Sequence, residues 1–515
     1  MFIGVDVGGT NTDAVLMDGS QLVGAAKAPT TGDVTSGIVD SVTELLRQYP
    51  THTTDAVMVG TTHFTNALLE RRELSPTAAL RLCLPATQLL PPLVDWPDEL
   101  KQAIGGLTYV VGGGNEFDGR EISSLDRAEL RAAARDMVRR GVRAVAVCGV
   151  FSPVDPAHEN EAAALIREEA PDLRVCLSHE NGRMGLLERE NAAALNACLG
   201  EVAHRTVRGI AEALKRLGID APLFMSQNDG TLMDTDFAAR FPVLTVSSGP
   251  TNSMRGAAYL SGITDGIVVD VGGTSTDVGA LVKGFPRESA VAVQLAGVRT
   301  NFRIPDMVSI ALGGGTVVTP EPWRMGPESV GYRLTAEARV FGGDVLTTTD
   351  LAVADGRASI GDPQRVAGLD PSMVERAMGE IQARVETAVD RVKLSGEDAP
   401  VVLVGGGSIL LGDALAGASQ ALRPEHAGVA NAIGAAIAQV GGQMERVYSL
   451  ESEGRAEAIA DCSAGAVQRA VAAGADPSTV EVVDVEEVPL TYIPSNATLV
   501  RVRAVGDLAL SGAGK

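Results

Sequence analysis

Residues 5–13 read VDVGGTNTD and residues 269–277 read VDVGGTSTD, and the two stretches differ only in Asn11 against Ser275. In each, an apolar β-forming run precedes the Gly-Gly pair and a second apolar run follows, which predicts a strand, a tight turn and a second strand. The copies lie too far apart for a solenoid repeat and indicate a duplicated domain. The sequence contains no GxxxxGK[ST], and this order differs from the strand–turn–helix order of P-loop and Rossmann motifs.

Strand and helix patterns alternate around the first hairpin. The apolar runs at 56–59 and 144–150 predict strands, and the amphipathic pattern at 125–140 predicts a helix. Such alternation is typical of an α/β domain with helices over a sheet. We expect this first domain over residues 1–185, ending before an Ala/Leu-rich helical pattern at 186–217.

A second α/β domain is expected over residues 186–444. It holds the second hairpin, a strand pattern at 401–404 and a helical pattern at 428–440. The remaining residues, 445–515, read as strand, helix, strand and strand. They predict a small C-terminal α+β domain whose last residues, 511–515, are loose.

The composition is that of a globular protein, with 515 residues of which 45% are hydrophobic and 21% charged. The net charge of −22 and the lack of a Lys/Arg cluster argue against nucleic acid or an anionic membrane as a partner. No apolar run reaches about 18 residues, so no membrane span is expected. The five cysteines form no CxxC pair and read as reduced, buried thiols. Since the start also lacks a signal-peptide pattern, we expect a cytoplasmic location.

The two hairpins have the chemistry of a phosphate clamp. Glycines let main-chain N–H groups approach phosphate oxygens closely, and threonine hydroxyls add donors. Asp6 and Asp270 end their strands and have the wrong sign for direct phosphate contact, so we expect Mg²⁺ between carboxylate and phosphate. The candidate phosphate-binding residues are Gly8, Gly9, Thr10, Asn11, Thr12, Gly272, Gly273, Thr274, Ser275 and Thr276.

Asp13 and Asp277 close the hairpins and are the further catalytic candidates, next to Asp6 and Asp270. Each is either a base or metal-holding group, or an ordinary turn carboxylate whose hydrogen bonds are satisfied locally.

Two more glycine runs follow strand patterns. Gly405, Gly406, Gly407 and Ser408 suit a loop against which adenosine lies, although a tight strand-to-helix turn has the same composition. Gly313, Gly314 and Gly315 with Thr316 form another candidate loop on the phosphate side.

Polar residues at the ends of predicted strands are substrate candidates, because α/β folds bind ligands there. Residues 60–66 read GTTHFTN between a strand and a helix pattern, and the alternative for Thr65 and Asn66 is that one of them only caps the helix. His179, Glu180 and Asn181 follow another strand, and the alternative for them is a solvated helix start. The substrate candidates are Thr62, His63, Thr65, Asn66 and Glu188.

The trio VDVGGTNTD, VDVGGTSTD and VLVGGGS (residues 402–408) resembles the phosphate-1, phosphate-2 and adenosine motifs of one ATPase superfamily. That superfamily joins sugar and acetate kinases, actin and heat-shock chaperones. The resemblance implies an α/β fold with two ribonuclease-H-like domains, the actin-like ATPase fold, closing over ATP, with the C-terminal α+β segment as a small appendage.

Further stretches resemble the hydantoinase/oxoprolinase family, A-subunit type: GTTHFTNALLER (60–71), ENGRMGLLERENAAALNA (180–197) and VFGGDVLTTTD (340–350). Members of that family use ATP and Mg²⁺ to phosphorylate an oxygen of a small cyclic amide, imide or ketone. Phosphorylation turns a poor electrophile into one that water can attack, and this attack opens the ring. In many members the hydrolytic step depends on a B-type subunit, and relatives serve ketone carboxylases.

The resemblance therefore implies an ATP-dependent hydrolase subunit that opens a cyclic amide of the hydantoin, 5-oxoproline or lactam type. Its metal would be held by Asp6 and Asp270. A small cyclic amide or ketone, a B-type hydrolase subunit and a homo- or hetero-oligomeric assembly are the expected partners. The alternatives are a small-molecule kinase that releases a stable phosphoester, and a chaperone-like ATPase that reactivates another enzyme.

Overall fold

In a computed structural model, the protein is described over residues 1–30, 34–50, 53–181, 184–289, 293–302, 304–451, 454–491 and 496–509. Both GGT turns form β-hairpins. β1 (Phe2–Val7) pairs antiparallel with β2 (Asn11–Asp18), and β11 (Gly266–Val271) pairs antiparallel with β12 (Thr276–Val282). The registers repeat, since Asp6 is opposite Asp13 and Asp270 is opposite Asp277. The predicted strand–turn–strand units are thus confirmed.

The first hairpin belongs to a nine-stranded sheet of order β22-β23-β21-β10-β9-β4-β1-β2-β3. β1, β4 and β9 run parallel, so their carboxyl ends meet at one edge of the sheet. The other strands of this sheet are β3 (Gln21–Pro29), β4 (Ala56–Thr61), β9 (Leu223–Ser226), β10 (Leu232–Asp234), β21 (Val440–Ser449), β22 (Glu481–Pro489) and β23 (Ala497–Gly506).

The C-terminal strands extend this nine-stranded sheet and do not form a sheet of their own. β21 crosses from the second half of the chain to pair with β10, and β23 then pairs with β21. α14 (Arg455–Ala472) packs on β21 and β23 through buried Cys462 and Ala466. The predicted order of strand, helix, strand and strand is present, while residues 511–515 lie outside the described residues.

The second hairpin belongs to a six-stranded sheet of order β13-β12-β11-β19-β20, with β16 pairing β12. α12 (Pro371–Val392) covers it and begins with Asp370 as N-cap and Pro371 in its first turn, a favoured start for a helix. The remaining strands are β13 (Phe285–Pro286), β16 (Met307–Ile310), β19 (Ala399–Val404) and β20 (Ala418–Leu422).

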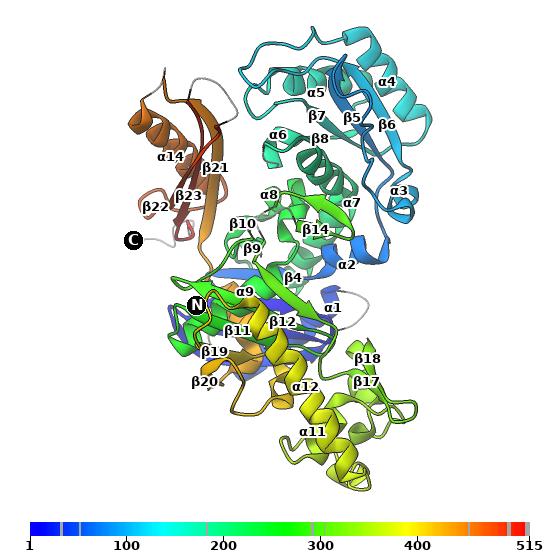
Figure 1. Ribbon diagram of the computed structural model, residues 1–515, viewed down its shortest axis with the longest axis vertical. Coiled ribbons are helices and arrows are strands. Elements are labelled where there is room, and N and C mark those ends of the chain that lie inside the picture. The colour runs from blue at the N-terminus through cyan, green and yellow to red at the C-terminus, as the bar shows by residue number, and fades with distance from the viewer. Residues whose placement is uncertain are drawn as a thin grey trace.

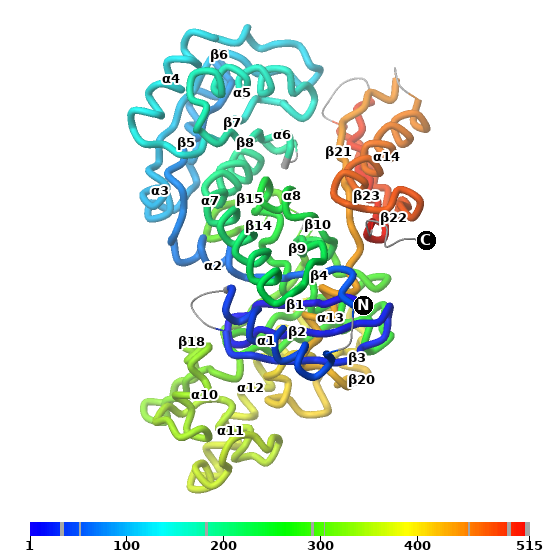
Figure 2. Tube along the Cα trace, turned by 180° about the vertical axis from the view of Figure 1, so that it is seen from behind, coloured from blue at the N-terminus to red at the C-terminus, as the bar shows by residue number. Residues whose placement is uncertain are grey.

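A four-stranded parallel sheet, β6-β5-β7-β8, is inserted after β4 and stands above the central sheets (Figure 1). The amphipathic pattern at 125–140 becomes α4 (Arg127–Arg139), capped by the side chain of Asp126. Viewed from the other side, this unit and the β21–β23 unit again stand as separate masses above the centre (Figure 2). The unit also contains β5 (Thr77–Leu84), β6 (Leu107–Gly112), β7 (Ala144–Gly149), β8 (Arg174–Leu177), α3 (Asp98–Ile104) and α5 (Ala157–Glu169).

Two helices cross where the halves meet. α9 (Ser248–Ser261) and α13 (Ala430–Ala436) pack backbone against backbone. A Cβ at Gly256 would lie 1.9 Å from the carbonyl oxygen of Ala430, and one at Gly434 would lie 1.9 Å from that of Asn252. The helix predicted over 428–440 is wrong beyond Ala436, because the chain turns there to enter β21 at Val440.

The long helical pattern is confirmed as α7 (Leu186–Arg216). In the described part of the chain, no helix combines the length and apolarity needed to cross a bilayer.

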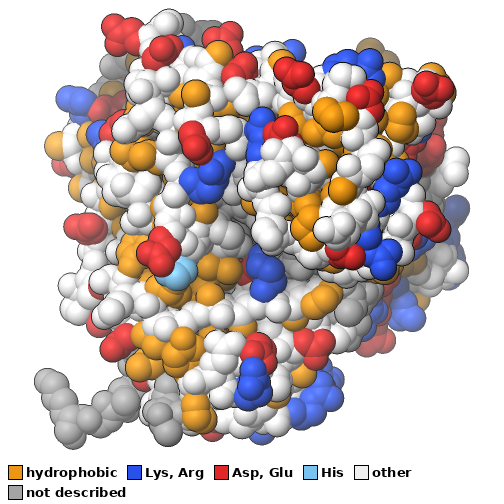
Figure 3. All heavy atoms as spheres, turned by 90° about the horizontal axis from the view of Figure 1, so that it is seen from below, with side chains coloured by type: hydrophobic (Ala, Val, Ile, Leu, Met, Phe, Trp, Pro, Cys, Tyr) orange, Lys and Arg blue, Asp and Glu red, His pale blue; other side chains and the backbone are white. Residues whose placement is uncertain are grey.

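On the face seen from below, acidic and basic side chains are interspersed and do not gather by sign (Figure 3). The other elements are α1 (Val34–Gln48), α2 (His63–Glu70), α6 (Ser178–Asn181), α8 (Thr235–Arg240), α10 (Leu334–Glu337), α11 (Thr348–Ala354), β14 (Val293–Leu295), β15 (Val298–Thr300), β17 (Thr316–Thr319) and β18 (Arg324–Ser329).

Candidate functional site

The tips of the two hairpins meet between the two halves. A Cβ at Gly273 would lie 2.1 Å from Thr10 Oγ1, and one at Gly9 would lie 3.7 Å from Thr274 Oγ1. The approach at Gly273 is closer than any side chain could tolerate, so glycine is required there for the hairpins to come together. The structure therefore brings the two predicted phosphate-binding turns into one place.

Each hairpin has a pair of carboxylates at its base. Asp6 is 2% exposed, and its Oδ2 accepts a hydrogen bond from Asn431 Nδ2 at 3.1 Å. Burial, and after it the charges of Asp13 and Asp270, raise the pKa of Asp6 to about 7. Burial also raises the pKa of Asp270, whose Oδ2 accepts a hydrogen bond from Ser253 Oγ at 2.5 Å.

The second member of each pair lies on the return strand. Lys27 Nζ is 2.8 Å from Asp13 Oδ1, although burial raises the pKa of Asp13 despite this cation. Burial raises the pKa of Asp277 to about 6, opposed by a hydrogen bond from Ser309. Four interacting carboxylates thus face one lysine, an imbalance that a bound divalent cation would offset.

Unsatisfied polar atoms mark the same place. Asp6 Oδ1, Thr10 Oγ1 and Asn252 Oδ1 are buried without a hydrogen-bond partner. Buried polar groups are normally paired, so a donor and two acceptors left open beside the hairpins fit a ligand with phosphate oxygens and hydrated metal. No group of three or more His, Cys, Asp or Glu side chains converges on a metal position within the described ranges. The residues present fit Mg²⁺ that is held partly by phosphate and water.

Thr12 and Thr276 point away from this place. They lie on the opposite face of their hairpins from the carboxylate pairs, because side chains alternate along a strand. Thr12 Oγ1 is 3.3 Å from Thr30 Oγ1, and Thr276 Oγ1 donates to the carbonyl of Leu312 at 2.6 Å. Both hydroxyls therefore stabilise the bases of the hairpins.

Asn11 and Ser275 close the turns through their main chains. The amide of Gly8 donates to the carbonyl of Asn11 at 3.0 Å, and that of Gly272 donates to the carbonyl of Ser275 at 2.9 Å. The one position at which the two motifs differ thus has the same backbone role in both hairpins.

The predicted adenosine loop packs directly on the second hairpin. A Cβ at Gly405 would lie 2.3 Å from Asp270 Oδ1, and one at Gly407 would lie 2.6 Å from the carbonyl oxygen of Gly272. The chain then enters a short 3₁₀ turn, Gly406–Leu410, in which Ser408 is buried. Around Gly406 the space is open, so the loop offers bare backbone beside the carboxylate of Asp270.

The loop at 313–315 supports the second hairpin with its main chain. The amide of Gly314 donates to the carbonyl of Gly272 at 3.0 Å, and that of Gly315 donates to the carbonyl of Gly273 at 2.6 Å. These two amides are occupied by protein carbonyls, so the loop shapes the turn that faces the phosphate.

The GTTHFTN residues lie beside the first hairpin, at the carboxyl end of β4. Thr62 Oγ1 donates to the carbonyl of Val7 at 3.2 Å. α2 begins at His63, so Thr65 and Asn66 lie inside the helix, and the interpretation of either as its cap is wrong. His63 and Thr65 are half-buried, whereas Asn66 is exposed.

The other substrate candidates are bound within the protein. Glu188 Oε1 lies 3.1 Å from Arg299 Nε. His179 Nδ1 lies 2.6 Å from Glu159 Oε2, and Glu180 pairs with Arg240. The side chain of Asn181 lies outside the described residues.

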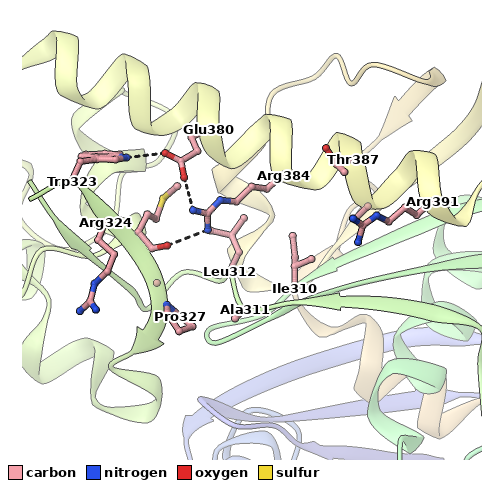
Figure 4. A pocket seen from close by; sticks show the side chains of 13 residues that line it. Ile310, Ala311, Leu312, Trp323, Arg324, Pro327, Glu380, Arg384, Thr387 and Arg391 are labelled. Atoms are coloured by element: carbon pink, nitrogen blue, oxygen red, sulfur yellow. Dashed lines mark hydrogen bonds and ion pairs between the residues drawn. The ribbon is translucent and has the colours of Figure 1, made fainter. Parts of the chain in front are cut away.

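Two large cavities lie in the described part of the chain. One, of about 690 Å³, separates α12 from β18, and there Glu380 accepts hydrogen bonds from Trp323 and Arg384 (Figure 4). The other, of about 510 Å³, is lined by His179, Glu180, Asn228 and parts of β21 and α14. None of the predicted phosphate-binding or adenosine residues lines either cavity.

Sequence reasoning missed the polar residues that surround the carboxylates. Asn252 and Ser253 come from α9, and Asn431 comes from α13. The stretch SSGPTNS at 247–253 has the serine, glycine and proline that are typical of a helix start, and this signal could have drawn attention to α9.

The sequence of this chain matches family models and curated relatives over most of its length. The family model for the hydantoinase/oxoprolinase N-terminal region matches residues 2–170, and that for hydantoinase/oxoprolinase matches residues 189–393. Caprolactamase subunit alpha of Pseudomonas jessenii is 28% identical over 69% of this chain and 54% of its own length. The acetophenone carboxylase gamma subunit of Aromatoleum aromaticum is 27% identical over 69% of this chain and 53% of its own length. The chain thus spans about half the length of these curated relatives.

A solved structure shows that the fold is shared. The ATP-dependent caprolactamase from Pseudomonas jessenii superposes with a TM-score of 0.77 at 21% identity, over 98% of this chain and 87% of that chain. The predicted fold, two ribonuclease-H-like domains of the actin-like ATPase type with a small α+β appendage, is confirmed.

Proposed function

Since this chain belongs to the hydantoinase/oxoprolinase family, we propose that it is an ATP-dependent enzyme subunit that phosphorylates the carbonyl oxygen of a small cyclic amide and so prepares the ring for opening. The amide would be of the hydantoin, 5-oxoproline or lactam type. Phosphorylation turns a poor leaving oxygen into a good one, which makes the carbonyl carbon a better target for water.

The observation that carries this proposal is the meeting of the two hairpins beside open polar atoms. Thr10 Oγ1 and Asp6 Oδ1 are buried without a hydrogen-bond partner next to the two GGT turns. A polyphosphate held from both sides would satisfy the donors, and its metal would satisfy the carboxylates.

Each residue then has a defined task. Thr10, Thr274 and the turn glycines orient the phosphates, and Gly405–Ser408 form the backbone wall for adenosine. Asp6 and Asp270 would hold the metal through its water ligands, and Asp13 and Asp277 would add negative charge that favours a bound cation. Bound Mg²⁺ would supply positive charge for the transferring phosphoryl group.

Names of the relatives support a partner subunit. They are described as a caprolactamase subunit alpha and an acetophenone carboxylase gamma subunit, which are parts of larger enzymes. We infer that this chain also works in an oligomer, with a B-type hydrolase subunit completing ring opening, and that a small ketone is the second substrate class to test.

The test is phosphate release by the full chain with Mg·ATP, against hydantoin, 5-oxoproline, lactams and simple ketones, with and without the partner candidate. We expect one class to stimulate release, and Asp6→Ala and Asp270→Ala to lower it at least 100-fold. Asp18→Ala is the matched control, because Asp18 lies exposed at the far end of β2.

Product analysis separates this function from the alternatives. A ring-opened acid with free phosphate supports the proposal, whereas a lasting phosphoester shows a small-molecule kinase. ATP turnover that only another protein stimulates shows a chaperone-like ATPase. Full turnover in both aspartate variants would contradict the metal assignment.

A further inference from the structure

The cavity of about 510 Å³ lies where several distant segments converge. Its wall combines Ser152 and His179 from the β5–β8 unit, Asn228 after β9, Asn301 after β15, and Gln443 from β21. Figure 1 shows the β5–β8 and β21–β23 units on either side of this region. The volume falls within the range of about 300–1,000 Å³ that is usual for small-molecule sites.

This cavity begins close to the first phosphate hairpin. Val5, Val59 and Met225 share one row across the parallel strands β1, β4 and β9. Gly8 and Asn228 each come three residues after that row, so they leave the sheet at the same edge.

Helix α9 connects the cavity to the carboxylates. Thr251 Oγ1 donates to the carbonyl of Asn228 at 2.9 Å. Its neighbour Asn252 donates to Ser226 Oγ at 3.1 Å. The side chains of Asn252 and Asp6 both lie against Gly60, where an added Cβ would be 2.5 Å from Asn252 Nδ2 and from Asp6 Oδ1. One turn of α9 therefore contacts both places.

The open hydrogen-bonding groups in this wall are neutral amides. Asn228 is 4% exposed and its Nδ2 has no partner, and both Nδ2 and Oδ1 of Asn301 are buried without a partner. A carboxamide offers donors on one side and an acceptor on the other, and rotation of its terminal amide exchanges them. Together the two side chains match a group that carries both a carbonyl and an N–H.

The charged groups of the wall already have partners. Arg240 pairs with Glu180, Arg446 with Asp461, and Glu445 with Arg501. Asp229 accepts hydrogen bonds from Thr231 and Gln443. Arg469 also lines the cavity; it donates to the main-chain carbonyl of Gln443 at 2.7 Å. What is left for a ligand is therefore the polarity of the two amides and this guanidinium, beside the apolar rings of Phe237, Phe241 and Phe302.

We propose that this cavity binds the phosphoryl acceptor, and that it selects a cyclic amide whose carbonyl and N–H pair with Asn228 and Asn301 while its ring packs on the phenylalanines. This inference rests on the proposed function and names the substrate pocket for it. Of the residues that the sequence suggested for substrate, His179 and Glu180 line the pocket, whereas Thr62 and Glu188 do not.

The test measures binding of δ-valerolactam and hydantoin to the full chain by calorimetry without nucleotide. We expect saturable binding that Asn228→Ala and Asn301→Ala each weaken at least tenfold, and that Leu244→Trp, which fills the cavity, abolishes. N-methyl-δ-valerolactam, which lacks the N–H, should bind at least tenfold more weakly than its parent. Asn160→Ala is the matched control, because Asn160 is exposed on α5 and should leave affinity within twofold.

Stability separates a binding role from a structural one. Removing a buried donor that has no partner costs little, so Asn228→Ala and Asn301→Ala should melt at or above the wild-type temperature. Unchanged lactam affinity in both variants and in Leu244→Trp, or no saturable lactam binding to the wild type, overturns the proposal.

The two proposals can fail separately. Lactam binding that depends on Asn228 and Asn301, without stimulated ATP turnover, supports the pocket and contradicts phosphorylation. Lactam-stimulated turnover with KM unchanged in both asparagine variants supports phosphorylation and contradicts the pocket. Asp6→Ala should retain lactam binding while losing turnover.

Discussion

Asp6 lies directly opposite Asp13 across the first hairpin, and both carboxylates are buried. Asp270 and Asp277 repeat this arrangement in the second hairpin. Paired acids at two meeting turns require a counter-charge, and the lysine at position 27 balances only one of them.

The raised pKa of Asp6 predicts a pH-dependent stability of the metal-free protein. In the unfolded chain this carboxyl ionises near 3.8, but in the folded protein it holds its proton up to about 7. Folding stability should therefore fall as the pH rises from about 4 to about 7, and stay lower above that. The loss is on the order of 4 kcal/mol. Calorimetric melting in chelator at several pH values should show a steeper decline for the wild type than for Asp6→Asn, and parallel curves would contradict this.

Magnesium should reverse that loss. A cation at the carboxylates favours their ionised form, so Mg·ADP should raise the melting temperature more at pH 8 than at pH 5. At about 100 times the dissociation constant the gain is about 2.7 kcal/mol. Asp270→Ala should lose the magnesium-dependent part of this gain, and Asp18→Ala should keep it. Equal gains with Mg·ADP and with ADP in chelator would rule out a metal at these residues.

Gly273→Ala should separate the hairpins. The added methyl would lie 2.1 Å from Thr10 Oγ1, so the turn must move by about 1 Å, and a shift of this size costs roughly 100-fold in rate. ATP turnover measures the effect. Gly379→Ala is the control, since Gly379 lies exposed in α12 with open space around it and should melt slightly higher with unchanged turnover. Wild-type turnover in Gly273→Ala would show that the turns need not meet.

The buried pair Arg81–Glu190 should act on stability alone. Both side chains are fully buried and joined by two hydrogen bonds of 2.7 Å. Glu190→Ala would leave the guanidinium unpaired at a cost of about 3–5 kcal/mol, whereas Arg81→Met with Glu190→Leu should recover much of it. Denaturant unfolding measures both variants. If the single variant is as stable as the double, the ion pair is not what holds α7 to β5.

The sequence by itself determined the two hairpins, their shared register and the α/β character of the chain. These features are local, because apolar alternation favours strands and the Gly-Gly pair favours a turn. The duplication is visible in the near-identity of residues 5–13 and 269–277. Helix α7 and the C-terminal order of elements follow from periodicity in the same way. The end of α13 does not follow from periodicity. Gly434 and its alanine neighbours suit a longer helix, but packing against α9 and the entry of the chain into β21 end the helix.

Only the tertiary structure decided what surrounds the hairpins. Asn431 reaches Asp6 across 425 residues of sequence, and no pattern near either residue reports that contact. The use of the loop at 313–315 as a support and the meeting of Asn228 with Asn301 at one cavity likewise depend on how separate elements pack. Local propensity acts over a few residues, whereas a site is a sum of contacts between distant ones, and these exist only once the core has closed.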